Sequence, residues 1–170
     1  MGADKIHVMF FCLGNICRSP LAEALFRHKL EAHGLSDQFH VESSGTSSYH
    51  VGEAPDPGSQ RVARERLDRD ISHQRSQQLQ PHHLQEFDYL VAMSDSNRRR
   101  AMQLEDNVDD DRVFLLRDFD PTDGADTDVP DPYGAGQSQF DLVYEIVDRS
   151  CEEFLDYLLE RHPELNRKPE

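Results

Sequence analysis

The chain alternates apolar runs typical of buried strands with stretches in which apolar residues recur at helical spacing. Residues 6–12, IHVMFFC, form a near-continuous apolar run, which is typical of a strand buried on both faces of a sheet. A helix is expected from Pro20 to about Ala32, because proline suits a first helical turn and Gly34 suits the position after the last. Further strands are expected at 38–45, 87–93 and 112–116, further helices at 59–68, 94–105 and 138–162, and a short helical turn at 81–87.

The order of these elements predicts the fold class. Strands that alternate with helices form parallel sheets whose connecting helices cover both faces. We therefore expect an α/β fold, a single domain with a four-stranded parallel sheet and helices on both faces, in a flavodoxin-like three-layer sandwich. The domain is expected to span residues 1–162, and residues 163–170 are expected to form a flexible tail.

The same order indicates where a ligand would bind. Open parallel sheets bind ligands beyond the carboxyl ends of their strands. Residues 12–19 follow the first strand, and an Asp-rich, Pro-rich and Gly-rich loop at 118–136 follows the fourth. Both segments are therefore expected at the ligand-binding edge of the sheet.

Composition and charge narrow the classes of function. The 170-residue chain has a net charge of −15, so we expect it to bind neither nucleic acid nor an anionic membrane surface. No apolar run approaches the ~20 residues of a membrane span, and no secretory signal is recognisable, which predicts a cytoplasmic location. Three cysteines are too few, and an odd number, for a secreted disulfide framework.

The segment CLGNICRS, residues 12–19, has the residues of an anion site. A loop that joins a buried strand to a helix N-terminus gathers backbone N–H groups in one concavity, and the helix dipole strengthens the site. Glycine and asparagine allow the tight turn, and arginine grips two oxygens of an oxyanion with its planar fork. The predicted phosphate-binding residues are Leu13, Gly14, Asn15, Ile16, Cys17, Arg18 and Ser19.

Cys12, at the start of this loop, is the candidate nucleophile. The N–H groups, the helix dipole and Arg18 all favour its thiolate form, and the Ser19 hydroxyl could add a hydrogen bond to the sulfur. A thiolate in a bowl shaped for phosphate is a nucleophile directed at phosphorus. Cys12 and Cys17 lack a second pair of ligands at zinc spacing, so no metal site is predicted.

Four segments resemble those of a known family. CLGNICRSPLAEALF at 12–26 resembles the phosphate-binding loop of low-molecular-weight protein tyrosine phosphatases. TSSYHVGEAPD at 46–56 resembles that family's substrate-wall loop, DYLVAMSDSN at 88–97 its third-strand segment and DPYG at 131–134 its acid loop. The resemblance implies hydrolysis of phosphotyrosine in proteins or peptides through a phosphocysteine intermediate, with inorganic phosphate as the product and without a cofactor.

The resemblance also implies roles for individual residues. The loop at 118–136 contains six aspartates, and composition alone does not choose among them; the family motif selects Asp131 as the general acid and base. Tyr49 and Tyr133 match the positions that flank the substrate entrance. His73 matches a histidine that supports the phosphate-binding loop through Asn15 and its neighbours, and Ser43 matches another supporting position.

Two related activities and one different class of function compete with this interpretation. Related phosphoarginine phosphatases carry Thr where this chain has Ile16, and related arsenate reductases use further cysteines, whereas here only Cys151 lies outside the loop. A non-catalytic phosphate-binding module is the third alternative. The complete set of Cys12, Arg18 and Asp131 argues against that module.

The second thiol of the loop suggests redox control. Cys12 and Cys17 lie five residues apart in a curled loop, so their Cα atoms could fall within disulfide reach, below ~7 Å. The resemblance implies that this pair oxidises reversibly and protects the nucleophile. Exposed Tyr49 and Tyr133 could support weak self-association, so the expected state is a monomer or a weak homodimer.

Overall fold

The computed structural model describes residues 5–106, 108–122 and 124–165. Its strands are β1 (Ile6–Cys12), β2 (Phe39–Gly45), β3 (Tyr89–Ala92) and β4 (Val113–Leu115). Its helices are α1 (Arg18–Ala32), α2 (Pro57–Leu67), α3 (Pro81–Glu86), α4 (Asp95–Met102) and α5 (Gln137–Arg161), with short 3-10 segments at η1 (Ser36–Gln38), η2 (Asp110–Arg112) and η3 (Leu116–Phe119). The elements follow the predicted order along the chain.

The four strands form one sheet in the order β2-β1-β3-β4. Every neighbouring pair is parallel. This arrangement confirms the predicted α/β three-layer fold with a four-stranded parallel sheet. Because β1 lies between β2 and β3, successive strands are added on opposite sides of it, and the segment after β1 therefore begins at the point where such sheets bind ligands.

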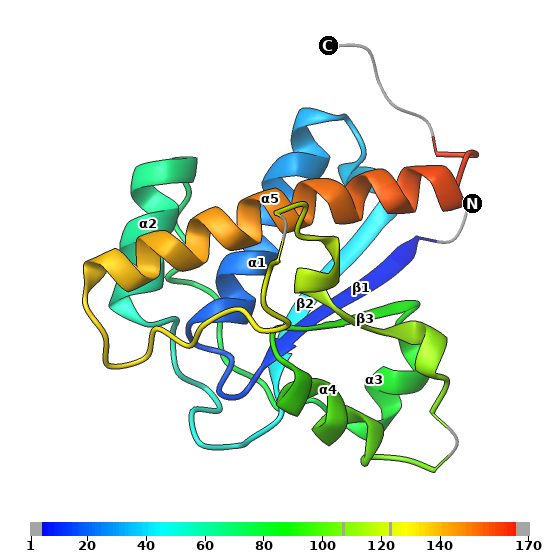
Figure 1. Ribbon diagram of the computed structural model, residues 1–170, viewed down its shortest axis with the longest axis horizontal. Coiled ribbons are helices and arrows are strands. Elements are labelled where there is room, and N and C mark those ends of the chain that lie inside the picture. The colour runs from blue at the N-terminus through cyan, green and yellow to red at the C-terminus, as the bar shows by residue number, and fades with distance from the viewer. Residues whose placement is uncertain (1–4, 107, 123, 166–170) are drawn as a thin grey trace.

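Helices cover both faces of the sheet (Figure 1). Helices α1, α2 and α5 pack against one face, and α3 and α4 lie on the other. Side chains of β1 alternate between two cores, with Val8 and Phe10 in the first and Met9 and Phe11 in the second. This double burial explains why β1 is apolar at almost every position, since each large side chain contributes roughly 1.5–3 kcal/mol when buried.

The first helix begins earlier than the sequence predicted. It starts at Arg18 rather than at Pro20, so the last residues of the candidate phosphate loop already belong to its first turn. Proline is tolerated here because amide groups of a first turn have no partner within the helix. Arg18 and Ser19 are therefore held by helical backbone geometry.

Helix α5 is the longest helix and the main cover of one face. Its buried stripe includes Phe140, Val147, Cys151 and Phe154, as its helical spacing predicted. None of the helices in the described parts of the chain is both long and apolar enough to cross a membrane.

The segment after α5 was predicted to be a flexible tail. The amide of Leu165 donates a hydrogen bond to the carbonyl of His162 at 3.1 Å, and the Leu165 side chain packs against the core. The remainder of the predicted tail, 166–170, lies outside the described residues.

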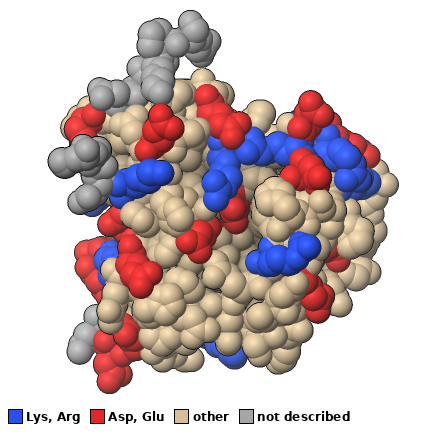
Figure 2. All heavy atoms as spheres, turned by 180° about the vertical axis from the view of Figure 1, so that it is seen from behind, with Lys and Arg blue, Asp and Glu red and all other residues tan. Residues whose placement is uncertain are grey.

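Charged side chains of both signs cover the outer helices. On the face in Figure 2, Lys and Arg gather across the upper half, with Asp and Glu between them. Lys29 of α1 pairs with Asp148 of α5 at 2.8 Å, and Arg66 of α2 pairs with Glu145 of α5 at 2.5 Å. An exposed pair such as Arg66–Glu145 is worth about 0–1 kcal/mol, so the layers are held together mainly by their apolar contacts.

Candidate active site

The loop between β1 and α1 is a tight turn anchored from outside. Its carbonyl groups accept hydrogen bonds from other segments, as when the Ser47 amide donates to Leu13 O at 3.0 Å and the Asp56 amide donates to Ile16 O at 2.7 Å. Asn15 has a φ of 58°, a left-handed conformation that asparagine tolerates better than most residues. Because its carbonyl groups are bonded to segments outside the loop, the amide groups of the loop remain available to bind an anion.

Gly45, at the end of β2, allows the loop to pass close by. A Cβ atom at this position would lie 2.7 Å from Leu13 O and 3.0 Å from the carbonyl carbon of Gly14. No side chain fits at such distances from backbone atoms. The end of β2 therefore packs directly against the backbone of the phosphate loop.

Cys12 lies at the end of β1, and its side chain is buried inside the loop. Its Sγ accepts a hydrogen bond from the Asn15 amide at 3.3 Å and lies 3.0 Å from Ser19 Oγ. Ser19 Oγ in turn accepts from Asn15 Nδ2 at 2.8 Å, so its single proton can go to the sulfur or to Ser44 O, which lies 3.2 Å away. The hydroxyl can therefore donate to a thiolate when one forms.

The side chain of Asn15 is held on both its polar atoms. Its Nδ2 also donates to Ser43 Oγ at 3.0 Å. Its Oδ1 accepts from the amide of Gln77 at 3.0 Å. Ser43 Oγ donates onward to Glu23 Oε1 at 2.7 Å.

The sequence interpretation missed two of these supports. Gln77 contacts Asn15 through its backbone amide, so no side-chain pattern could have indicated it. Glu23 could have been predicted from the sequence, because it follows Ser19 by one helical turn and therefore lies on the same side of α1.

His73 is not brought to the phosphate loop. Its side chain is exposed, and none of the hydrogen bonds among the described residues joins it to Asn15. The expectation that His73 supports the loop therefore stays a prediction. The donor to the asparagine oxygen in this structure is the backbone amide of Gln77.

Arg18 has one edge that makes no hydrogen bond to the described residues. Its side chain is 7% exposed, and one terminal nitrogen, Nη1, donates to Val129 O at 3.1 Å. Its Nε is buried and has no hydrogen-bond partner among the described residues. The Nε–H and the adjacent Nη2 form the edge of the guanidinium fork that binds oxyanions in pairs of parallel hydrogen bonds.

Asp131 lies over this arginine. Its Oδ2 is 3.7 Å from Nη2 of Arg18, and its Oδ1 accepts from the Tyr133 amide at 3.1 Å. The loop that carries Asp131 is fixed to the end of β3, because the Val129 amide donates to Met93 O at 2.8 Å. The carboxylate is half-exposed.

These residues surround a slot of about 180 Å³. Its lining residues are Cys12, Leu13, Gly14, Ile16, Cys17, Arg18, Tyr49, His50, Asp131 and Tyr133. Tyr49 is 77% exposed and Tyr133 is 59% exposed, so the two rings stand at the rim of the slot. Their suggested part in weak self-association stays a prediction.

His50 is a wall residue that the sequence interpretation missed, although it follows Tyr49 directly. The centroid of its ring lies 5.7 Å from that of Tyr133, and its Nδ1 lies 3.1 Å from Glu53 Oε1. A Cβ on Gly14 would lie 2.9 Å from the His50 ring, so the glycine makes room for this wall.

Cys17 is the second thiol of the slot. Burial raises the pKa of the Cys17 thiol, and the nearby Asp56 and Cys12 raise it further. It is therefore protonated at neutral pH. Among the described residues, no group of three or more His, Cys, Asp or Glu side chains is arranged to hold a metal ion.

Few classes of protein place a thiol inside an anion-binding loop, with an arginine beside it and a carboxylate above. The cysteine-dependent phosphatases are such a class, and the fold and the slot are those expected of it. Comparison with known proteins identifies the family. A model of the low molecular weight phosphotyrosine protein phosphatases matches residues 7–168, so the chain belongs to this family.

Individual relatives agree with this assignment. The chain is 38% identical over 154 residues to the low molecular weight protein-tyrosine-phosphatase PtpA of Staphylococcus epidermidis, with 91% of this chain and 94% of that protein covered. It is 38% identical over 160 residues to the low molecular weight protein-tyrosine phosphatase A of Mycobacterium tuberculosis, with coverage of 94% and 95%. The crystal structure of YfkJ from Bacillus subtilis superposes with a TM-score of 0.86 at 31% identity, covering 95% of this chain and 99% of that one. The protein is thus a low molecular weight protein tyrosine phosphatase.

Proposed function

We propose that the protein hydrolyses phosphotyrosine in proteins or peptides through a phosphocysteine intermediate on Cys12. The observation that carries the proposal is the convergence of Cys12, Arg18 and Asp131 on one slot of about 180 Å³. Each of the three supplies a function that the reaction needs: a nucleophile, a clamp for the phosphoryl oxygens and a proton donor.

In the first step, the Cys12 thiolate attacks phosphorus and the bond from phosphorus to the tyrosyl oxygen breaks. The free edge of Arg18 and the loop amides hold the phosphoryl oxygens as charge shifts onto them. Asp131, protonated at this stage, gives its proton to the departing oxygen, which would otherwise leave as a phenoxide.

In the second step, the Asp131 carboxylate accepts a proton from a water molecule. The water oxygen attacks phosphorus, the bond from sulfur to phosphorus breaks, and inorganic phosphate leaves with the Cys12 thiolate restored. Ser19 donates its hydrogen bond to the sulfur as the negative charge returns, which stabilises the leaving thiolate.

The rim favours an aromatic substrate. Tyr49 and Tyr133 offer two ring faces, and offset or edge contacts with a third ring are favourable. Ile16 lines the slot where the related phosphoarginine phosphatases carry Thr. The arsenate alternative has no further thiol near the slot, because Cys151 is fully buried in the core on α5.

Turnover of phosphotyrosine and phosphoarginine peptides by the parent, Cys12→Ser and Asp131→Ala tests the proposal. We expect the parent to prefer phosphotyrosine, and Cys12→Ser to lose about 10³-fold or more in kcat/KM. Asp131→Ala should slow alkyl-substituted phenyl phosphates by about 10²–10⁴-fold and p-nitrophenyl phosphate much less, because a good leaving group needs little protonation.

A variant of another aspartate in the same loop serves as the control. Asp126 is exposed and does not line the slot, so Asp126→Ala should behave like the parent. Undiminished turnover in Cys12→Ser would refute the mechanism. Equal slowing of good and poor leaving groups in Asp131→Ala would reject that residue as the acid.

A further inference from the structure

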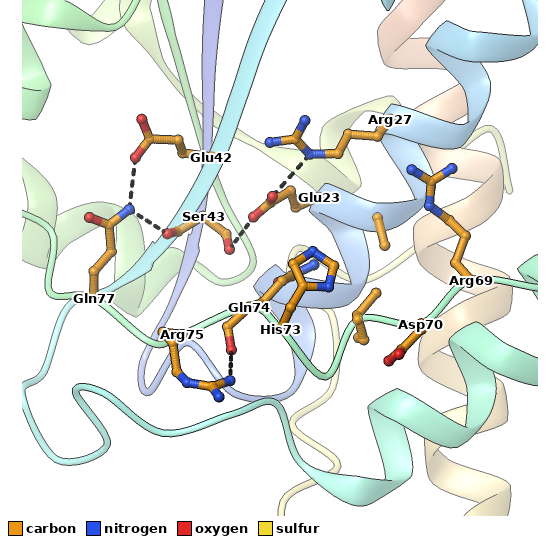
Figure 3. Close-up of a pocket in the computed structure, with 12 residues that line it drawn as sticks. Glu23, Arg27, Glu42, Ser43, Arg69, Asp70, His73, Gln74, Arg75 and Gln77 are labelled. Atoms are coloured by element: carbon orange, nitrogen blue, oxygen red, sulfur yellow. Dashed lines mark hydrogen bonds and ion pairs between the residues drawn. The ribbon is translucent and has the colours of Figure 1, made fainter.

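A second cavity, of about 630 Å³, lies beside the phosphate-binding loop and shares no lining residue with the slot. It is formed by α1, β2 and the segment at 69–77 (Figure 3). Its charged lining residues are Glu23, Arg27, Glu42, Arg69, Asp70 and Arg75, and His73 lies among them. On a chain with a net charge of −15, a cavity with equal numbers of arginines and carboxylates is a local exception.

The carboxylates of this cavity are already occupied by donors of the protein. Glu23 accepts from Ser43 Oγ at 2.7 Å and from Arg27 Nε at 3.0 Å. Glu42 accepts from Gln77 Nε2 at 2.8 Å and pairs through its other oxygen with a neighbouring histidine. The third carboxylate, Asp70, accepts from the Ser72 amide at 2.9 Å.

Several donors of the cavity are not matched by a carboxylate. Arg75 uses one nitrogen to donate to the carbonyls of Ser72 and Gln74, and among the described residues it has no acidic partner. No hydrogen bond among the described residues involves the His73 ring. Arg27 donates through Nε to Glu23 and through one terminal nitrogen to a carbonyl of β2, which leaves its other terminal nitrogen. The cavity therefore has free hydrogen-bond donors that can bind an acceptor, and because two of them are arginines, a negatively charged acceptor is favoured.

The cavity is connected to the nucleophile by a chain of hydrogen bonds. Glu23 accepts from Ser43, Ser43 accepts from Asn15 Nδ2 at 3.0 Å, and the same nitrogen donates at 2.8 Å to Ser19, the neighbour of the sulfur. A ligand that draws Arg27 away from Glu23 removes a positive charge from one end of this series of hydrogen bonds. The change is transmitted to Ser19, at the other end, beside the Cys12 sulfur.

We propose that this cavity binds a small organic anion with two or more phosphate or carboxylate groups, and that its occupancy alters the reactivity of Cys12. Two anionic groups are needed because the free donors lie on different walls, Arg27 on α1 and His73 and Arg75 on the 69–77 segment (Figure 3). The volume is in the range of pockets that hold metabolite-sized molecules.

Calorimetric titration of the protein, with its slot filled by benzylphosphonate, tests the binding. The probes are citrate, fructose 1,6-bisphosphate and inorganic phosphate. At least one of the two organic anions should bind at one site, and Arg75→Ala should weaken that binding at least tenfold. Arg99→Ala is the matched control, because Arg99 is an exposed arginine of α4 that does not line the cavity, and it should bind like the parent.

The three probes also identify the chemistry that the cavity accepts. Binding of citrate alone would assign a polycarboxylate, and binding of the bisphosphate alone would assign a phosphorylated molecule. The absence of binding by both organic anions, or equal binding by Arg75→Ala and Arg99→Ala, would overturn the proposal. Inorganic phosphate that binds as tightly as either organic anion would overturn the requirement for two groups.

The rate at which neutral iodoacetamide alkylates Cys12, with the slot empty, tests the coupling without relying on phosphatase activity. A saturating organic anion should change this rate at least twofold in the parent and in Arg99→Ala, but not in Arg75→Ala. An unchanged alkylation rate in the parent would refute the coupling. The same change of rate in Arg75→Ala would also refute it, because the anion would then act by binding in the slot.

Discussion

At the scale of the residue, the site depends on single hydrogen-bonding groups with few alternatives. Asn15 adopts a left-handed conformation and directs its amide at Cys12, while its side chain holds Ser19 and Ser43. Ser19 has one proton to give, and the sulfur competes for it with a backbone carbonyl. Ionisation of Cys12 decides this competition, because a thiolate is the stronger acceptor.

The second thiol allows a test at the same scale. We expect Cys17→Ala, once inactivated by peroxide, to recover less activity with dithiothreitol than the parent does, because no disulfide protects Cys12 from higher oxidation. Burial raises the pKa of Cys17, so disulfide formation should quicken as the pH rises and more thiolate forms. The measurement is recovered turnover after timed exposure to peroxide.

The third cysteine provides the control for this experiment. Cys151 is buried in the core on α5, far from any role in the slot, so Cys151→Ala should recover as the parent does. Equal recovery by Cys17→Ala and the parent would show that the second thiol gives no protection.

At the scale of the element, the loop at 118–136 is held in place by its other aspartates. The side chain of Asp120 has no exposed surface and binds Arg149 of α5 at 2.9 Å and Arg117 of η3 at 3.0 Å. Arg117 donates to Asp128 O at 2.8 Å, and Asp128 Oδ1 accepts from the Asp95 amide at the start of α4, also at 2.8 Å. These contacts join the loop to three elements and thereby position Asp131.

The ion pairs of Asp120 with Arg149 and Arg117 lead to a prediction about the stability of the fold. Asp120→Asn should lower the free energy of unfolding by about 2 kcal/mol, because it leaves two partly buried guanidinium groups without a charged partner. It should also reduce kcat/KM through misplacement of Asp131. Asp118→Asn, at an exposed position of the same loop, is the control and should change stability by less than about 0.5 kcal/mol.

The pH dependence of this effect has a definite sign. Burial alone would raise the pKa of Asp120, but hydrogen bonds from Arg149, Thr122 and Arg117 outweigh it and hold the pKa below the ordinary value of 3.8. The carboxylate therefore stabilises the fold fully above that value, and the contribution is lost as the pH falls toward the folded pKa. Chemical denaturation below pH 4 should show a steeper loss in the parent than in Asp120→Asn; parallel losses would contradict this role.

At the scale of the whole molecule, a chain with a net charge of −15 binds an anionic substrate. The loop amides, the start of α1 and Arg18 create positive potential inside the slot, while the surrounding protein repels a phosphopeptide as it approaches. Salt screens the distant repulsion more than it screens the buried contacts.

The salt dependence of turnover measures this balance. For a phosphotyrosine peptide with acidic flanks, kcat/KM should rise about threefold as the salt concentration goes from about 10 to about 150 mM, because the screening length falls from about 30 Å to about 8 Å. A peptide with basic flanks should show the opposite trend. A decrease for both peptides would mean that local contacts in the slot dominate over the field of the whole protein.

The amino-acid sequence by itself determined the order of the elements and the parallel sheet. It also indicated that residues 12–19 form one anion-binding loop. These features are local, since the periodicity of a segment reflects its own burial and the loop lies within eight consecutive residues. The family motif also pointed to Asp131, although the other aspartates of that loop were chemically indistinguishable in composition.

Only the tertiary structure decided which groups meet across long stretches of chain. It assigned Asp120 as a buried anchor, brought the Gln77 amide to Asn15, moved His73 to a separate cavity and added His50 to the slot. Such contacts depend on the packing of distant segments and often on backbone atoms, which every residue carries. A side-chain pattern therefore cannot encode them, and they appear only when the sheet and its helices have been assembled.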